Sequence, residues 1–167
     1  MSHRIRLRQP LPADQREFLA SVRRSRALHH PWTSAPSTPA RFRAYVELAT
    51  RPGYRGMLVC ERDTGAIAGV INISNIVAGA FRSGYLGYYA FSGYERRGLM
   101  REGLRALVRY AFVTLKLHRL EANIQPANLA SIALARSCGF KLEGYSPRYL
   151  KIAGRWRDHE RWAIRAS

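Results

Sequence analysis

The chain has 167 residues, 47% of them hydrophobic and 23% charged, which predicts a single domain over residues 1–167 and excludes extensive disorder. Its 28 Lys and Arg residues outnumber its 11 Asp and Glu residues, and the formal charge of +17 is carried almost entirely by arginine. This charge favours a polyanionic partner such as nucleic acid, a ribosome surface or a nucleotide cofactor, although a GC-rich genome that encodes Arg in place of Lys would produce it as well.

Membrane spans, secretory signals and cysteine-based sites are all disfavoured by the sequence. No stretch approaches the roughly 18 consecutive apolar residues of a membrane span, and residues 1–6 lack the apolar run of a secretory signal. Cys60 and Cys138 are far apart and have no metal-ligand spacing, so neither a disulfide framework nor a zinc site is expected. We therefore expect a cytoplasmic protein with no bound metal and no membrane partner.

The first half of the chain predicts strands and helices in a mixed order. Residues 5–8 alternate apolar and polar side chains as a strand does, and apolar residues recur at helical spacing in residues 13–28. A second helix is expected over residues 39–49, because Thr38 suits its N-cap and Pro39 its first turn.

A hairpin and a tyrosine-rich strand follow. Residues 54–61 and 66–77 are expected strands, joined by a turn at Asp63-Thr64-Gly65. Residues 83–91 form the next expected strand.

The apolar pattern then changes to a helical period, which predicts a helix over residues 98–116. A strand over residues 118–124 and a helix over residues 128–138 follow, with Asn128 as its N-cap. Two final strands are expected within residues 145–163. The order β-α-α-β-β-β-α-β-α-β-β predicts an α/β or α+β fold with a mixed sheet.

The segment before the long helix combines glycine with arginine and reads Tyr94-Glu95-Arg96-Arg97-Gly98-Leu99-Met100. The first amides of a helix have no partner inside the helix, and the helix dipole adds about half a positive charge there. Such a segment can hold a phosphate group, but an ordinary solvated turn can have the same composition.

Several linked motifs in this order resemble the GNAT acetyltransferases, and above all their RimJ/RimL branch. Besides the glycine and arginine segment, they are Leu86-Gly87-Tyr88-Tyr89, His118-Arg119-Leu120-Glu121-Ala122-Asn123, Pro126-Ala127-Asn128-Leu129-Ala130-Ser131, Gly139-Phe140-Lys141-Leu142-Glu143-Gly144 and Gly154-Arg155-Trp156-Arg157-Asp158-His159. The resemblance implies a GNAT-like single domain, whose mixed twisted sheet is splayed between the fourth and fifth strands and has helices on both faces. It also implies acetyl-CoA as the cosubstrate.

The resemblance also assigns residues to the cofactor. It implies that pantetheine pairs with the backbone of Tyr89, Ala90 and Phe91, and that Asn128 and Ser131 face the pantetheine arm and the sulfur. The pyrophosphate would lie on the backbone amides of Arg96, Arg97, Gly98, Leu99 and Met100.

Two positions depart from the family pattern. The family's pyrophosphate loop usually reads Q/R-x-x-G-x-G/A, whereas Glu95 and Met100 stand at the first and last positions here. The tyrosine that many relatives carry seven residues after the asparagine is Ala135, so a protonating tyrosine is not carried over.

Acetyl transfer to an amine requires a base for the amine, donors for the oxyanion and a proton for the departing thiolate. By resemblance, Glu121 is the candidate base, although a strand glutamate in an ion pair with Arg119 would have the same spacing. Ser131 is the candidate proton donor, although a small helix residue can also serve packing alone.

The acceptor is expected to be the N-terminal α-amino group of a protein, such as a ribosomal protein. A small amine (polyamine, amino acid or aminoglycoside) is the alternative within the same reaction class. A basic ribosome- or RNA-binding module without catalysis is the alternative outside it. A monomer and a homodimer both remain open.

Overall fold

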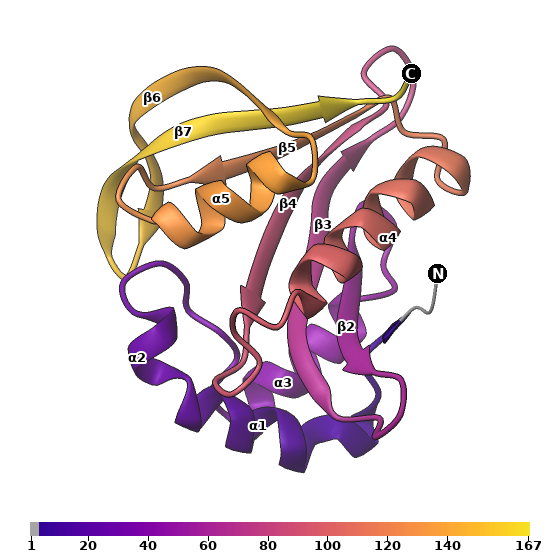
Figure 1. Cartoon of the computed structure of the whole chain (residues 1–167), viewed down its shortest axis with the longest axis vertical. Helices are drawn as coiled ribbons and strands as arrows, with labels where there is room; N and C mark the ends of the chain where they lie inside the picture. The colour runs from indigo at the N-terminus through magenta and orange to yellow at the C-terminus, as the bar shows by residue number, and fades with distance from the viewer. Residues whose placement is uncertain (1–3) are drawn as a thin grey trace.

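In the computed structural model, which describes residues 4–167, seven strands form one mixed sheet in the order β1-β2-β3-β4-β5-β7-β6 (Figure 1). Residues 1–3, which begin the segment that lacks a secretory signal pattern, lie outside the described residues. The strands are β1 (Ile5–Arg8), β2 (Arg55–Glu61), β3 (Ile67–Val77), β4 (Ser83–Ala90), β5 (Arg119–Ile124), β6 (Lys141–Ile152) and β7 (Arg155–Arg165).

The sheet has one parallel pair, formed by β4 and β5, and the other neighbouring strands are antiparallel. The parallel pairing begins at Ser83 and Arg119 and ends at Leu86 and Ala122. Beyond these residues the two strands diverge, as Figure 1 shows. The splayed mixed sheet expected from the sequence is therefore confirmed.

Helices cover both faces of the sheet, also as expected (Figure 1). Because strand residues alternate between faces, neighbours on β2 enter different cores. Val59 packs in the core beneath the last two helices, whereas Leu58 packs in the core beneath the first ones. None of the helices in residues 4–167 is long and apolar enough to cross a membrane. The helices are η1 (Pro12–Asp14), α1 (Gln15–Arg24), α2 (Arg26–His29), α3 (Pro39–Leu48), α4 (Leu99–Val113) and α5 (Leu129–Ser137).

Ser25 divides the first expected helix, so the single helix predicted over residues 13–28 is wrong. The hydroxyl of Ser25 donates to the carbonyl of Ser21 at 2.6 Å and accepts the N–H of Ser92 at 2.9 Å. A serine hydroxyl that binds the backbone competes with helical hydrogen bonds. The break therefore ties the α1–α2 segment to the loop that follows β4.

The C-terminal hairpin begins earlier than expected. The strand predicted to start near Tyr145 starts at Lys141, with only three residues between it and the end of α5 at Ser137. Residues 141–143 are all exposed and lack an alternating pattern, but β6 pairs along its length with β7. Backbone pairing, which leaves no mark in the side-chain pattern, sets this boundary.

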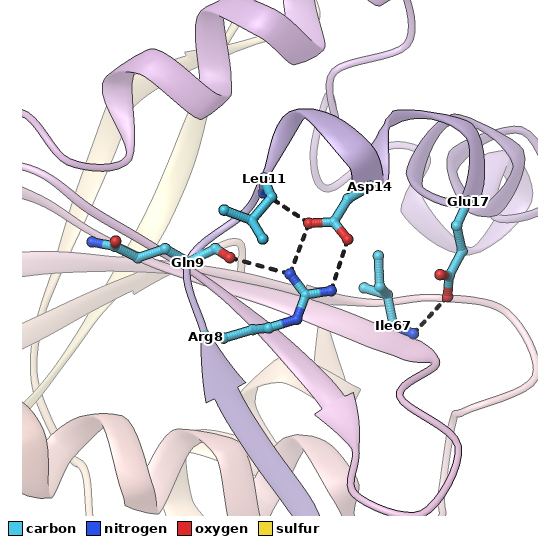
Figure 2. Close-up of polar contacts among 6 residues, drawn as sticks. All are labelled: Arg8, Gln9, Leu11, Asp14, Glu17 and Ile67. Atoms are coloured by element: carbon cyan, nitrogen blue, oxygen red, sulfur yellow. Dashed lines mark hydrogen bonds and ion pairs between the residues drawn. The ribbon is translucent and has the colours of Figure 1, made fainter.

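Polar contacts fix α1 to the start of the sheet, as Figure 2 shows. Arg8 donates from both Nη atoms to the two carboxylate oxygens of Asp14, each at 2.7 Å, and Leu11 N–H donates to the same carboxylate. Partial burial opposes ionisation of Asp14, but Arg8 and Leu11 outweigh it and lower the pKa of the carboxyl. Glu17 on α1 accepts the N–H of Ile67 at 2.7 Å, so α1 is held against the start of β3.

Candidate active site

The backbone of Ala90 faces the opening between β4 and β5. Phe91 N–H donates to Ala68 at 2.8 Å, and Tyr89 pairs with Val70, so both residues direct their backbone toward β3. Consecutive residues of an antiparallel strand turn their backbone groups to opposite sides, and Ala90 therefore points the other way. Of the three residues expected to pair with pantetheine, Ala90 directs its backbone toward the space between β4 and β5, whereas Tyr89 and Phe91 direct theirs toward β3.

His29 binds one of the two backbone polar groups of Ala90, its carbonyl oxygen. Its Nε2 lies 2.8 Å from the carbonyl oxygen of Ala90, and its ring packs edge-on against Tyr89 with centroids 4.9 Å apart. His29 is buried, and burial lowers its pKa more than the Ala90 carbonyl raises it. The carbonyl is thus bound by α2, which leaves the N–H of Ala90 facing the opening.

The loop before α4 presents its amides at the start of that helix. Gly98 is the N-cap and has left-handed backbone angles (φ 78°, ψ 0°), and Arg96 has a positive φ of 59°. The carboxylate of Glu95 accepts the N–H of Gly93 at 2.6 Å. The unusual glutamate is therefore bound within its own loop.

The two loop arginines differ in their surroundings. Arg97 forms an ion pair with Glu61 at the end of β2, and its guanidinium carbon lies 5.4 Å from the centroid of the Tyr94 ring. Arg96 is exposed and has no ion-pair partner within residues 4–167. The loop therefore offers an anion its first-turn amides and the free charge of Arg96.

Glu121 lies in the parallel part of the sheet, where β5 pairs with Tyr85 on β4 and Ala163 on β7. The residue is 8% exposed, and Arg119 donates to its carboxylate at 2.7 Å. The same guanidinium lies 2.7 Å from Glu143, whose pKa it lowers. The ion pair that the sequence allowed is thus present, and it is partly buried.

Tyr149 from β6 lies over the same region. Burial raises its pKa, and the neighbouring Tyr85 and Glu121 raise it further. The C-terminal hairpin therefore brings a phenol beside Glu121 and Tyr85, which are paired residues in the centre of the sheet.

A second polar group lies on the other face of β4. Ser131 on α5 donates from Oγ to the hydroxyl of Tyr88 at 3.1 Å, and that hydroxyl donates to the Ser131 carbonyl at 3.1 Å. Asn128 accepts the N–H of Ser131 at 3.3 Å and so caps α5 as predicted. Burial raises the pKa of Tyr88 to about 12, although Ser131 opposes the shift.

The sequence of residues 4–141 matches the family model of the acetyltransferase (GNAT) domain. The chain belongs to the GNAT acetyltransferase family.

Curated proteins and solved structures agree with this GNAT membership. The chain is 45% identical over 99 residues to ribosomal protein uS5-alanine N-acetyltransferase of Escherichia coli (strain K12), which covers 59% of this chain and 51% of that protein. The chain thus spans about half the length of that relative. It is 31% identical over 134 residues to L-methionine sulfoximine/L-methionine sulfone acetyltransferase of Pseudomonas paraeruginosa, covering 76% of this chain and 74% of that protein.

The solved structures include Mycobacterium smegmatis RimJ in complex with CoA-disulfide. It superposes with a TM-score of 0.90 at 26% identity and covers 97% of this chain and 82% of that chain. The expected resemblance to the RimJ/RimL branch of the GNAT family is therefore confirmed at the level of fold and relatives.

The GNAT opening has two sides in this chain. Leu86 and Tyr88 face the core beneath α4 and α5, whereas Tyr85 lies on the opposite face with its partner Glu121. Ser131 and Glu121, the two expected catalytic residues, consequently lie on different faces of the sheet.

Tyr88 and Tyr149 were absent from the expected site residues. Tyr88 stands two residues before Ala90 and two after Leu86, so strand alternation alone places it on the α5 face. That signal was present in the sequence. The position of Tyr149 depends on how the C-terminal hairpin curves over the sheet, which the sequence pattern does not show.

Proposed function

We propose that this chain is a cytoplasmic, acetyl-CoA-dependent N-acetyltransferase whose acceptor is the N-terminal α-amino group of a protein, such as a ribosomal protein. The observation that carries the proposal is the divergence of β4 and β5, with the N–H of Ala90 on one side and the cap of α4 at Gly98 beyond it. The E. coli relative named for acetylating uS5 and the RimJ structure with CoA-disulfide support the choice of cosubstrate and acceptor.

Each of the site residues has a separate role in the proposed reaction. The acceptor nitrogen attacks the thioester carbonyl carbon, the carbon–sulfur bond breaks, and the nitrogen loses a proton to Glu121, directly or through water. The thiolate takes up a proton from the paired hydroxyls of Tyr88 and Ser131. The first-turn amides after Gly98, together with Arg96, hold the pyrophosphate, and Ala90 N–H pairs with pantetheine.

Incubation with acetyl-CoA and a panel of peptides and small amines is expected to acetylate peptide α-amines. An α-amine has a reference pKa of about 7.7–8.0 and is easily neutralised, whereas a lysine side chain near 10.4 is not. Mass spectrometry of the products locates the acetyl group. Acetylation confined to lysine or polyamine nitrogens would contradict the proposed acceptor.

An amino acid is the second candidate acceptor, because the Pseudomonas relative, which aligns over most of the chain, is named for acetylating methionine derivatives. The same panel separates the two if it contains free amino acids. A basic binding module without catalysis is a third possibility, and calorimetry with acetyl-CoA tests it, since such a module would release no binding heat.

Replacing Tyr88 by Phe is expected to lower kcat about tenfold, because the thiolate loses one of its two proposed proton donors while Ser131 retains a hydroxyl. Replacing Ser131 by Ala should have a similar effect, and the double variant should lose less than the product of the two, since the hydroxyls act as one unit. Steady-state kinetics with the preferred peptide measure all three. Fully multiplicative losses would mean that the two hydroxyls act independently.

A further inference from the structure

Three side chains on β5 and β7 carry buried polar atoms that lack a hydrogen-bond partner within residues 4–167. They are Oδ1 of Asn123, Nε of Arg157 and Nε of Arg161. Asn123 and Arg161 are direct partners in the β5–β7 pairing. Buried polar groups in proteins nearly always have a partner, so adjacent exceptions indicate a place where another molecule completes the bonds.

These side chains lie on the acceptor face, which we define as the face of the sheet that carries Glu121. Trp162 packs in the core with α4 and α5, so its neighbour Arg161 points to the opposite face. Paired residues share a face, and Glu121 lies two residues before Asn123 on β5. Arg161 also lowers the pKa of Glu143, which places its charge beside the carboxylates of this face.

Gly144 gives Arg161 its position. The guanidinium of Arg161 lies directly over the backbone of β6 at Gly144, where a Cβ atom would collide with it. The side chain is therefore held flat across the hairpin, near Tyr149, rather than extended into water.

The nearby carboxylates are already bound by other groups. Glu121 and Glu143 share Arg119, and Asp158 accepts from the Tyr145 hydroxyl and from Arg148 N–H at 2.5 and 2.8 Å. Neither Arg157 nor Arg161 has an ion-pair partner in the described part of the chain. The unpaired Arg161 near these carboxylates, with Arg157 farther along β7, favours an anion and disfavours a cation.

We propose that Arg161, with Asn123 beside it and Arg157 farther along β7, binds a carboxylate carried by the acceptor close to its reacting amine. The proposal rests on the proposed acetyltransferase function and narrows its acceptor class. The carboxylate is either the α-carboxylate of a free amino acid or the acidic side chain of a residue next to a peptide N terminus. Polyamines, which have no carboxylate, are excluded as preferred acceptors.

Acceptor pairs that differ in whether they carry the carboxylate test this subsite. The pairs are a short peptide with Glu or Gln at its second position, and a free amino acid and its amide, with spermidine as the cationic acceptor. We expect kcat/KM to be roughly 10- to 100-fold higher for the acid in at least one pair, because charge-assisted hydrogen bonds are the strong ones. The pair that shows the preference identifies the source of the carboxylate.

The variant Arg161→Gln is expected to reduce that acid-to-amide ratio to about one through a higher KM for the acid, since a neutral amide cannot pair with the carboxylate. Arg155→Gln is the matched control, because Arg155 is exposed at the start of the same strand and the charge change is the same. Arg161→Lys retains the charge without the forked donors and should leave an intermediate ratio. It replaces Arg161→Gln if the latter fails to fold.

Equal rates for acid and amide in both pairs, preference for spermidine, or an unchanged ratio in Arg161→Gln would each overturn the subsite. Binding of the acid and amide acceptors to the CoA-bound protein, measured by calorimetry, provides a readout without turnover. Preferential binding of the acid without acetyl transfer would support the subsite while removing the proposed catalytic function. Acetylation of both acceptors with equal binding would support the proposed catalytic function and contradict the subsite.

Discussion

Replacing Glu121 by Gln is expected to lower kcat for a peptide acceptor by roughly 10²–10⁴-fold, the usual share of general base catalysis. The amide keeps the size of the side chain but cannot take a proton from the amine. KM for acetyl-CoA should change little, because Glu121 lies on the face of the sheet away from α4 and α5. The defect should shrink above about pH 8, where an α-amine with a pKa of about 7.7–8.0 is already neutral.

Glu143 provides the matched control for this prediction. It pairs with the same Arg119 at the same 2.7 Å, but it is exposed on β6. Glu143→Gln therefore removes one carboxylate from Arg119 without touching the base, and it should leave kcat close to normal. Equal losses in the two variants would mean that the freed Arg119 causes the defect, and a loss in Glu121→Gln that persists at every pH would indicate a positioning residue.

The parts of the fold that follow from local rules could be predicted from the sequence. Asn128 caps α5 with the side-chain contact its position predicted, and the long helix begins at the glycine and arginine segment as expected. The break at Ser25 could not be predicted, since the hydroxyl is bound by Ser92, a residue brought to it by the fold. Local patterns therefore predict helix caps, whereas a contact between distant segments can interrupt a helix that the local pattern predicts.

Some features of the candidate site could likewise be predicted from the sequence, and others could not. Strand alternation would have placed the backbone of Ala90 and Tyr88 toward the opening, and the backbone of Tyr89 and Phe91 toward β3. The sharing of Arg119 between Glu121 and Glu143 depends on the order β5-β7-β6, in which the chain returns antiparallel beside β5. No spacing in the sequence encodes that neighbourhood. The orientation of Glu95 toward Gly93 likewise required the backbone of the loop.

Replacing Gly98 by Val is expected to weaken acetyl-CoA binding about 100-fold, the loss of one or two charge-assisted hydrogen bonds. Gly98 caps α4 with φ 78°, a conformation that a β-branched residue rarely adopts. Its Cβ would also lie 3.1 Å from Nη2 of Arg4, which is bound to Glu102 in the first turn of the helix. The loop must therefore move, and its amides no longer converge on one anion. Calorimetric titration with acetyl-CoA measures the change.

The control variant Gly154→Val distinguishes the loss of the cofactor site from a general effect of backbone strain. It has the same φ of 78° at the turn between β6 and β7, and a Cβ there would meet no atom of residues 4–167 within 4 Å. Gly154→Val therefore strains a similar backbone conformation at a distance from α4, at a cost of roughly 1–2 kcal/mol of stability for left-handed angles. Both variants should show a lower melting temperature, but Gly154→Val should bind acetyl-CoA as the unaltered chain does. If Gly98→Val binds acetyl-CoA with unchanged affinity, the pyrophosphate does not rest on the start of α4, and the exposed Arg96 is left without its proposed role.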